Sequence, residues 1–466
     1  MKYVSTRGEA PEIGFLDAVM AGLAGDGGLY CPETWPQVTS EEIAAMAGRP
    51  YAEVAADILS RFAGDEIDRE TLNELCREAY ATFNHPAVTP LVQLAPGQFL
   101  LELFHGPSLA FKDVAMQMLS RLYEHALKAR GRTLTIVCAT SGDTGGAAVE
   151  AFRGRPNVRV VAMFPEGRIS EVQRRYMTTA DDANVACLSL AGDFDDCQAI
   201  LKELFRDAQF SRGVDLAAVN SINFARIVAQ IVYYFVAAAA LGAPGRPVTF
   251  AVPTGNFGDA FAGYAAWRMG LPIERIIVAT NGNDIVARAL TDGRYARGEV
   301  RETASPAMDI QVSSNFERLY FEGVQRQGEE TGRAFRAFAE TGAIDIPPVA
   351  LNAMRELFVG VAVSESETAR TQLSIANETG QIIDPHTAVG VAGAQRVGPV
   401  RPTTPVVVLS TAHPAKFPET VLKATGVAPP EPLRARGLAA KPEKFRRLPA
   451  DAEAVKTFVR DFVYNA

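Results

Sequence analysis

Lys112 is the residue of this chain best suited to act as a nucleophile. It stands in residues 105–113, directly before a helical pattern that begins at Val114. Apolar side chains flank it, so partial burial would disfavour the ammonium form, and the positive end of the following helix acts in the same direction. A lysine that is neutral part of the time can attack an aldehyde and form a Schiff base. The alternative is a lysine that lies along the helix start with its charge in water.

Two glycine-rich loops each follow a predicted strand and open a predicted helix. The first, residues 141–146, follows the strand 133–140, and the second, residues 254–259, follows the strand 248–252. One such loop would be weak evidence, because tight strand-to-helix turns need glycine anyway. Two loops can hold two anions through converging backbone N–H groups and helix dipoles, for example a cofactor phosphate and a substrate carboxylate. Neither loop matches the P-loop or the dinucleotide-binding pattern, which argues against a nucleoside triphosphatase and a dinucleotide enzyme.

Composition excludes several classes of protein. The net charge of −8 disfavours nucleic acid as a partner, since no basic stripe could replace its counterions. Five scattered cysteines without a CxxC pattern argue against a disulfide framework and a zinc site, so we expect no metal and a reducing compartment. The N-terminus lacks the apolar core of a signal peptide, which favours a cytoplasmic location. The longest apolar run, residues 227–243, is slightly short for a membrane span and predicts a buried helix.

The order of the predicted elements indicates an α/β fold. Residues 1–90 read as helical, and from about residue 98 short apolar runs alternate with helical patterns, as in parallel sheets covered on both faces. Ligands in such folds bind beyond the carboxyl ends of the strands, where both glycine loops lie. The helical stretches of the N-terminal part are expected near residues 15–24, 40–48, 51–62 and 67–82. Further strands are expected at residues 158–163, 185–190, 276–279 and 405–409.

The second half of the chain is less regular. Helical patterns near residues 317–341 and 347–377 predict a helical insertion at about 283–385. A Pro-rich linker then leads into a tail that ends in a predicted helix at residues 452–464. We expect this tail to pack against the fold and to take no part in chemistry.

Six segments of the chain, in this order, resemble the motifs of threonine synthases, which are pyridoxal-phosphate (PLP) enzymes of the tryptophan-synthase-β type. They lie at residues 3–30, 104–113, 139–145, 220–230, 255–259 and 409–417. The resemblance runs to about residue 425. It implies a two-lobed parallel-sheet α/β fold (fold type II) with a helical N-terminal domain at 1–90. A catalytic domain at 91–425, carrying the helical insertion, and a C-terminal tail at 426–466 complete the implied organisation.

The resemblance also implies the cofactor site. Lys112 would carry pyridoxal 5′-phosphate as a Schiff base. Thr411 would place its hydroxyl at the pyridine nitrogen, where many other PLP enzymes use an aspartate; its alternative role is a helix cap. Asp259 is expected to cap the following helix. The loop implied to hold the cofactor phosphate through backbone N–H groups consists of Gly255, Asn256, Phe257, Gly258 and Asp259.

The first glycine loop is implied to grip the substrate carboxylate. Asp143 is expected beside the cofactor, and closing a turn is its alternative role. The residues of this loop implied to bind substrate are Ser141, Gly142, Thr144 and Gly145.

A cationic partner is also needed for the phosphate of the substrate. Arg226 is the first candidate, because a guanidinium can pair bidentately with phosphate, and Lys416 is the second. Asn220 belongs to the polar entry of the helix that contains Arg226, and Asn223 is expected to cap that helix. Two histidines, His386 and His413, are expected to shape nearby loops.

The activity implied is that of threonine synthase, a lyase of threonine biosynthesis that converts O-phospho-L-homoserine and water to L-threonine and phosphate by γ-elimination and β-hydration. The alternatives are a PLP-dependent phospho-lyase or a serine/threonine dehydratase of the same fold. Dehydratases as a rule lack segments such as 3–30 and 220–230, which argues against them. A non-catalytic binding module would be expected to have lost Lys112 or the glycine loops, and both are intact. The sequence favours neither a monomer nor a homodimer.

Overall fold

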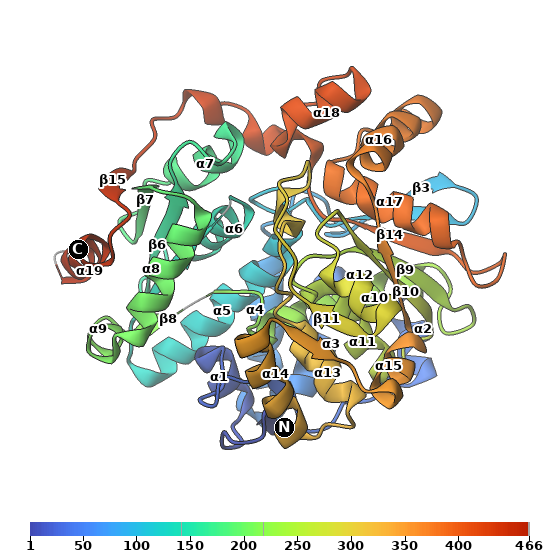
Figure 1. Cartoon of the computed structure of the whole chain (residues 1–466), viewed down its shortest axis with the longest axis horizontal. Coiled ribbons are helices and arrows are strands. Elements are labelled where there is room, and N and C mark those ends of the chain that lie inside the picture. The colour runs from blue at the N-terminus through green and yellow to red at the C-terminus, as the bar shows by residue number, and fades with distance from the viewer. Residues whose placement is uncertain (141, 218, 465–466) are drawn as a thin grey trace. The chain divides into compact units, whose positions relative to one another are not determined.

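The computed structural model describes residues 1–140, 142–217 and 219–464, and the chain divides into two compact units (Figure 1). Unit 1 comprises Met1–His105 and Ser221–Pro429, and unit 2 comprises Gly106–Asn220 and Pro430–Ala466. Each unit is built around its own sheet, which is parallel in unit 2 and mainly parallel in unit 1.

The sheet of unit 1 has six strands in the order β13-β10-β9-β14-β4-β3. Neighbouring strands are parallel except for the hairpin of β3 and β4. The strands are β3 (Leu91–Ala95), β4 (Gln98–Glu102), β9 (Val248–Pro253), β10 (Ile273–Thr280), β13 (Phe358–Ala362) and β14 (Val406–Ser410). Because β4, β9 and β14 run in the same direction, the segments that follow them begin at one edge of this sheet.

Helices cover the sheet of unit 1, and α17 packs on its β9, β10 and β14 strands. Small residues permit this contact: a Cβ added at Gly390 of α17 would lie 2.9 Å from a methyl carbon of Val408. The helices that follow the N-terminal part are α10 (Phe224–Ala240), α11 (Gly258–Arg268), α12 (Ile285–Asp292), α13 (Phe316–Gly323), α14 (Gly328–Thr341), α15 (Pro348–Arg355), α16 (Glu365–Thr379), α17 (Pro385–Val397) and α18 (Pro418–Thr425).

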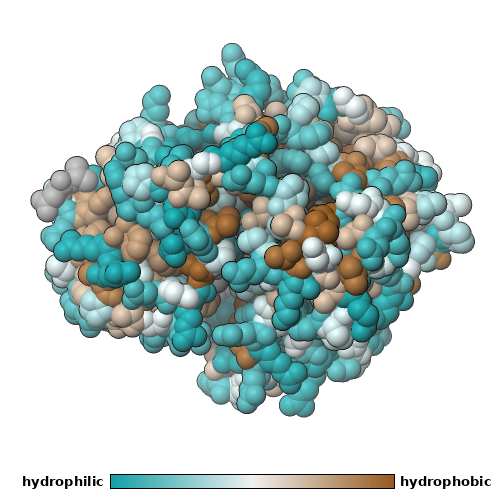
Figure 2. Space-filling view, turned by 90° about the horizontal axis from the view of Figure 1, so that it is seen from above, coloured by the Kyte–Doolittle hydropathy of each residue, from teal (hydrophilic) through white to brown (hydrophobic). Residues whose placement is uncertain are grey.

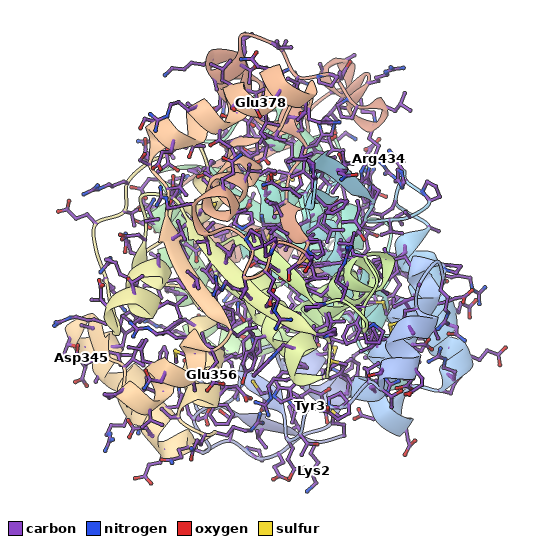
Figure 3. The ribbon with its side chains drawn as sticks, turned by 90° about the vertical axis from the view of Figure 1, so that its right-hand side faces the viewer. Lys2, Tyr3, Asp345, Glu356, Glu378 and Arg434 are labelled. Atoms are coloured by element: carbon purple, nitrogen blue, oxygen red, sulfur yellow. The ribbon has the colours of Figure 1, made fainter. Side chains whose placement is uncertain are left out.

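The N-terminal part of unit 1 contains the four expected helices. They are α1 (Phe15–Ala21), α2 (Ser40–Ala45), α3 (Tyr51–Ala63) and α4 (Arg69–Tyr80). It also contains two short antiparallel strands, β1 (Tyr3–Ser5) and β2 (Tyr30–Pro32), so the prediction of a purely helical segment was wrong. Three-residue strands are too short to show an alternating pattern. Tyr3 is fully buried and donates to the carbonyl of Phe62, whereas Lys2 extends away from the ribbon (Figure 3).

The predicted helical insertion is interrupted in two places. The helical pattern of residues 317–341 is two helices, α13 and α14, because Gln325 and Arg326 between them adopt positive φ values of 57° and 63°. The pattern of residues 347–377 contains strand β13, which pairs with β10 and joins the main sheet. Its Gly360 lies so close to α12 that an added Cβ would approach the backbone of Ala287 to 2.8 Å. A small two-stranded sheet, β11 (Arg294–Ala296) with β12 (Ala343–Asp345), also belongs to this region.

The sheet of unit 2 has five parallel strands in the order β15-β7-β6-β5-β8. They are β5 (Leu134–Ala139), β6 (Val158–Pro165), β7 (Val185–Ala191), β8 (Leu216–Ala217) and β15 (Arg446–Pro449). The helices of unit 2 are α5 (Lys112–Arg130), α6 (Asp143–Phe152), α7 (Glu171–Thr178), α8 (Phe194–Arg206), α9 (Ala208–Gly213) and α19 (Ala452–Tyr464). The helix expected at residues 452–464 is therefore confirmed, and its Val455 and Val459 join the core formed with β5, β6, β7 and α8.

The apolar run at residues 227–243 is a core helix, as expected. Of the residues in α10, fifteen are buried, including Gln230. Among the described residues, no helix is both long enough and apolar enough to cross a membrane. The face seen in Figure 2 carries mostly hydrophilic side chains, with small, separate hydrophobic patches.

Candidate active site

The second glycine loop follows β9 in unit 1 and opens α11. Phe257 adopts the left-handed conformation at φ 62°, which turns the chain into the helix at Gly258. Asp259 accepts a hydrogen bond from the N–H of Ala260 at 2.8 Å, so it satisfies an amide of the first helical turn without being the N-cap residue itself. Gly255 is packed so tightly that an added Cβ would lie 2.8 Å from the carbonyl oxygen of Ala307.

Three residues from the segment before α13 hold this loop. Ser313 Oγ donates to the carbonyl of Gly255 at 2.8 Å, and the backbone N–H of Asn315 donates to the carbonyl of Asn256 at 3.1 Å. Ser314 Oγ donates to the side-chain oxygen of Asn256 at 3.1 Å. None of these three contacts could be predicted from the sequence, because nothing in the residues around 313–315 indicates which distant loop they contact.

The loop has the features of an anion site. Its carbonyl groups are engaged by Ser313 and Asn315, whereas no described residue accepts a hydrogen bond from the backbone N–H groups of residues 255–258. Unpaired N–H groups at a helix N-terminus attract a phosphate through both hydrogen bonding and the helix dipole. The structure of this loop therefore fits the cofactor phosphate that the resemblance implies.

Thr411 follows β14, the strand next to β9. Its side chain is nearly buried, and no described residue forms a hydrogen bond with its hydroxyl. The alternative helix-cap role does not apply, since the short 3-10 helix Pro414–Lys416 is capped by His413, whose Nδ1 accepts from the N–H of Ala415 at 3.1 Å. The Thr411 hydroxyl is thus available to a ligand at the same sheet edge as the phosphate loop.

Arg226 lies in the first turn of α10 and is almost fully buried. Asn223 caps this helix, as expected, by accepting from the N–H of Ala225 at 3.0 Å. The guanidinium of Arg226 makes no hydrogen bond with any described residue, and its Nε is fully enclosed. Burial lowers the pKa of Arg226 to about 10, although the nearby charge of Asp259 acts in the opposite direction. A buried cation of this kind requires an anionic or polar partner.

Lys416, the second candidate for the substrate phosphate, and Asn220, expected at the polar entry of the Arg226 helix, differ in exposure. Lys416 closes the 3-10 helix after Thr411 and is only 1% exposed, whereas Asn220 is exposed in unit 2.

Lys112 is the first residue of α5 in unit 2, two residues earlier than expected. Its side chain is 12% exposed, and its Nζ lies 4.8 Å from the ring centre of Phe111. The expected partial burial is present. The carboxylate of Asp143, at 3.5 Å from Nζ, adds an effect that the sequence did not reveal, because it favours the ammonium form.

The first glycine loop lies at the start of α6. Thr140 Oγ1 accepts from the N–H groups of Gly142 and Gly145, both at 2.9 Å, so Thr140 helps to close the turn. Asp143 lies between Lys112 and Gln173, whose Nε2 donates to it at 3.0 Å. Thr144 lies in the first turn of α6. Ser141 lies outside the described residues.

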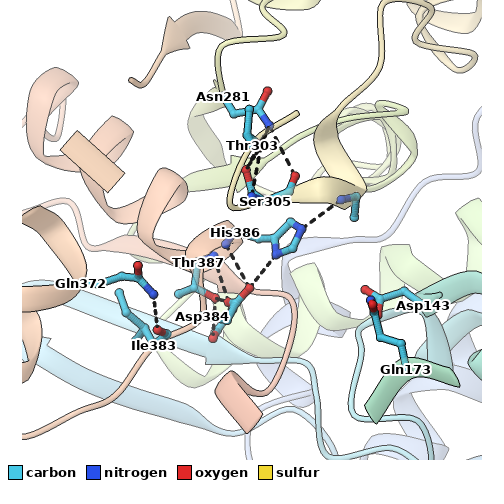
Figure 4. A network of polar contacts seen from close by, with 12 residues as sticks. Asp143, Gln173, Asn281, Thr303, Ser305, Gln372, Ile383, Asp384, His386 and Thr387 are labelled. Carbon is cyan, nitrogen blue, oxygen red and sulfur yellow. Dashed lines mark hydrogen bonds and ion pairs between the residues drawn. The ribbon is translucent and has the colours of Figure 1, made fainter. Parts of the chain in front are cut away.

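A buried hydrogen-bond network in unit 1 holds the segment that contains Ala307, which packs on Gly255 (Figure 4). Asp384 accepts from the backbone N–H and the Nδ1 of His386, at 3.0 and 2.7 Å. The opposite ring nitrogen, Nε2, accepts from the N–H of Ala307 at 3.2 Å, and the carbonyl of Ala307 is the group that packs on Gly255. This arrangement requires neutral His386 with its proton on Nδ1. His386 and His413 thus shape loops at this sheet edge, as expected.

Comparison with known proteins agrees with this geometry. The family model described as pyridoxal-phosphate dependent enzyme matches residues 82–357, that of the threonine synthase N terminus residues 2–80, and that of the threonine synthase C-terminal region residues 387–459. A threonine synthase of Pseudomonas aeruginosa is 47% identical over 98% of both chains. A threonine synthase of Schizosaccharomyces pombe is 42% identical, covering 90% of this chain and 88% of its own.

Solved structures give the same result. The PLP-bound threonine synthase of Brucella melitensis has a TM-score of 0.97 and 51% identity, with all of both chains covered. The yeast threonine synthase has a TM-score of 0.94 and 38% identity, covering 100% of this chain and 99% of its own. The fold, the lysine and the anion loop define a PLP-dependent enzyme of fold type II. Within that class, the chain belongs to the threonine synthase family.

Proposed function

We propose that this enzyme converts O-phospho-L-homoserine and water to L-threonine and phosphate. Two observations support the proposal. Lys112 is a partly buried lysine at a helix start, and at the start of α11 no described residue accepts a hydrogen bond from the backbone N–H groups of residues 255–258. The relationship to threonine synthases over nearly the whole chain supports the same reaction and disfavours a dehydratase or phospho-lyase.

The cofactor residues have separate roles in this proposal. Lys112 would hold the aldehyde carbon of PLP, the loop of residues 255–258 would hold its phosphate, and Thr411 would offer its hydroxyl to the ring nitrogen. When bound, PLP withdraws electrons from the substrate carbon that carries the amino group. A hydroxyl at position 411 leaves the ring nitrogen mostly unprotonated, which makes this withdrawal weaker than with an aspartate.

Proton transfer in the reaction is assigned to Lys112. When it is not bound to the cofactor, its amino group would remove the proton from Cα of the substrate and later one from Cβ. The bond between Cγ and the phosphate oxygen then breaks and a proton is added at Cγ. Water adds its hydroxyl to Cβ and gives up its other proton to the released phosphate, and a proton returns to Cα to complete threonine. The Asp143 carboxyl group lies 3.5 Å from the lysine nitrogen, and in its ionised form it would stabilise the protonated amine between transfers.

Binding of the substrate phosphate is assigned to Arg226, with Lys416 as the second candidate. The support for Arg226 is its burial without a hydrogen-bonding partner among the described residues. We also propose a cytoplasmic location. Its support is that the five cysteines, all within the described part of the chain, are buried and form no disulfide.

The test is a product assay with the purified holoenzyme. We expect phosphate and threonine to form in equal amounts from O-phospho-L-homoserine, and Lys112→Ala to form neither. Phosphate with 2-oxobutyrate in place of threonine would instead establish the phospho-lyase alternative.

A further inference from the structure

A glutamine on α7 holds the carboxylate that contacts Lys112. Asp143 directs Oδ2 towards Lys112 Nζ at 3.5 Å, and its Oδ1 accepts from Gln173 Nε2 at 3.0 Å. Figure 4 shows the amide of Gln173 directed at Asp143. All three residues belong to unit 2, and both Gln173 and Asp143 are only 5% exposed. The carboxylate therefore has one oxygen towards the lysine and the other towards the glutamine.

Gln173 is fixed by a second set of contacts. It is the third residue of α7 and forms a capping box with Ser170: its N–H donates to Ser170 Oγ at 3.2 Å, and its Oε1 accepts from the backbone N–H of Ser170 at 3.4 Å. The same Oε1 also accepts from Ser170 Oγ at 3.1 Å. Glutamate fills this position of a capping box as well as glutamine does. Only the amide, however, has an acceptor for Ser170 and a donor for Asp143 at the same time. The sequence shows the Ser170-x-x-Gln173 pattern, but the pattern alone predicts a helix start and nothing about Asp143.

Gly142, the residue before Asp143, packs closely against the side chain of Gln173. Gly142 has φ 127°, a conformation that other residues rarely adopt, and a Cβ added there would lie 2.6 Å from Cδ of Gln173. The loop and the side chain of Gln173 are therefore in direct contact, which leaves the amide little room to turn away from Asp143.

The neighbouring charged groups on α5, α6 and α7 have partners of their own. Asp113 on α5 accepts from the N–H and Oγ of Ser108. Glu150 on α6 pairs with Arg153; burial raises its pKa, and the charge of Arg434 acts in the opposite direction. On α7, Glu171 pairs with Arg175, and Arg174 pairs with Glu443. Burial raises the pKa of Tyr176 on α7, which keeps that side chain neutral. Asp143 is thus the carboxylate through which the contact with Gln173 can change how readily Lys112 loses its proton.

We propose that Gln173 is a positioning residue that, by holding the Asp143 carboxylate ionised and in place, sets the pH range over which Lys112 binds and releases PLP. The inference rests on the proposed function, in which Lys112 carries the cofactor. In the attachment step the ammonium loses one proton to solvent, the neutral amine adds to the aldehyde, and one water leaves as the C=N bond forms. A carboxylate beside Nζ stabilises the ammonium and so raises the pH at which attachment proceeds.

The test follows attachment of PLP to the apoprotein, recorded as the rate of appearance of visible absorbance against pH. Gln173→Met removes the donor to Asp143, so we expect its rate profile to move to lower pH. Gln173→Glu preserves the capping box and places a second carboxyl group beside Asp143. The Asp143 charge raises the pKa of that group, and above this pKa its negative charge adds to the stabilisation of the ammonium, so we expect the profile to move to higher pH by about one unit. Movement in opposite directions is the result that supports a role in positioning Asp143.

Ser170→Ala is the matched control, because it disrupts the capping box and leaves the donor to Asp143 in place. If Gln173 served only the cap, Gln173→Glu would match the wild type, whereas Gln173→Met and Ser170→Ala would both lower the melting temperature without moving the profile. That result would overturn the inference. If Gln173→Met does not fold, Gln173→Glu carries the test alone.

Borohydride reduction followed by peptide mapping separates failure of the inference from failure of the proposed function. PLP fixed at a lysine other than Lys112 would contradict the assignment of the cofactor lysine. PLP fixed at Lys112, together with coinciding pH profiles in all Gln173 variants, would contradict only the role of Gln173.

Discussion

Without a bound phosphate, the buried charge of Arg226 should lower the stability of the folded protein. When a phosphate binds, the interaction of this charge with the phosphate should be favourable. Arg226 is only 3% exposed, and its guanidinium has no hydrogen bond to any described residue. Burial lowers its pKa to about 10, roughly 2.5 pH units below the usual value of an arginine, and at 1.36 kcal/mol per unit this corresponds to about 3 kcal/mol. Because both the folded and unfolded chains are protonated below pH 10, that unfavourable contribution is fully present at neutral pH and disappears only as pH rises beyond 10.

Arg226→Met removes the charge and keeps much of the side-chain volume. We expect the free energy of unfolding of the apoprotein at pH 7 to stay equal or to rise by up to about 3 kcal/mol. We expect kcat/KM for O-phospho-L-homoserine to fall by about ten- to a hundred-fold, which corresponds to losing a hydrogen bond of about 1.5–3 kcal/mol to a charged group. Denaturant unfolding of the apoprotein and steady-state kinetics of the holoenzyme measure the two effects.

The chain contains a matched control in Arg318, which is also fully buried. Arg318 donates to the carbonyls of Tyr30 and Ile222 and to the side chain of Asn315. Arg318→Met should therefore cost at least about 3 kcal/mol of stability, since it leaves these acceptors without their donor. If Arg226→Met lost as much stability as Arg318→Met while kcat/KM fell no further than the loss of folded protein explains, Arg226 would be structural and the substrate phosphate would need another partner.

Three further changes test other parts of the site. Gly255→Val should weaken PLP retention, because its Cβ would lie 2.8 Å from the carbonyl of Ala307 and displace the loop; an unchanged dissociation constant for PLP would reject the phosphate-loop assignment. Thr411→Asp should change the absorbance spectrum of the holoenzyme and slow threonine formation, since a carboxylate favours a protonated ring nitrogen; an identical spectrum and rate would place Thr411 away from the ring. His413→Asn should make the free energy of unfolding less sensitive to acid. Burial lowers the pKa of His413 to about 4, so below pH 6.5 the unfolded chain binds a proton that the folded wild type does not bind. The free energy of unfolding of the wild type therefore falls by up to about 3 kcal/mol between pH 6.5 and 4. Equal pH dependence of unfolding in wild type and variant would contradict that explanation.

The sequence was most informative where local chemistry decides the structure. Both glycine loops follow strands and open helices, α19 spans the residues expected, and Asn223 caps α10. Strand β13 was mistaken for helix because its five residues lie between two genuine helices, and only pairing with β10 makes them a strand.

The contacts that position the site could not be predicted, because they join segments far apart in the chain. Ser313 holds Gly255, and Ala307 is tied to His386 through one ring nitrogen. Gln173 donates to Asp143 thirty residues earlier. A serine, a glutamine or a histidine in a sequence offers donors and acceptors in several directions, and the tertiary fold determines which one is used.

The most direct test of the proposed reaction is the fate of oxygen from water. When the holoenzyme acts on O-phospho-L-homoserine in water labelled with heavy oxygen, cleavage of the bond between Cγ and oxygen followed by hydration at Cβ places the label in the hydroxyl of threonine. The released phosphate then keeps only its original oxygens, and mass spectrometry of both products measures this distribution. Label in the phosphate, with none in threonine, would show that water attacks phosphorus and would contradict the elimination and hydration assigned to Lys112.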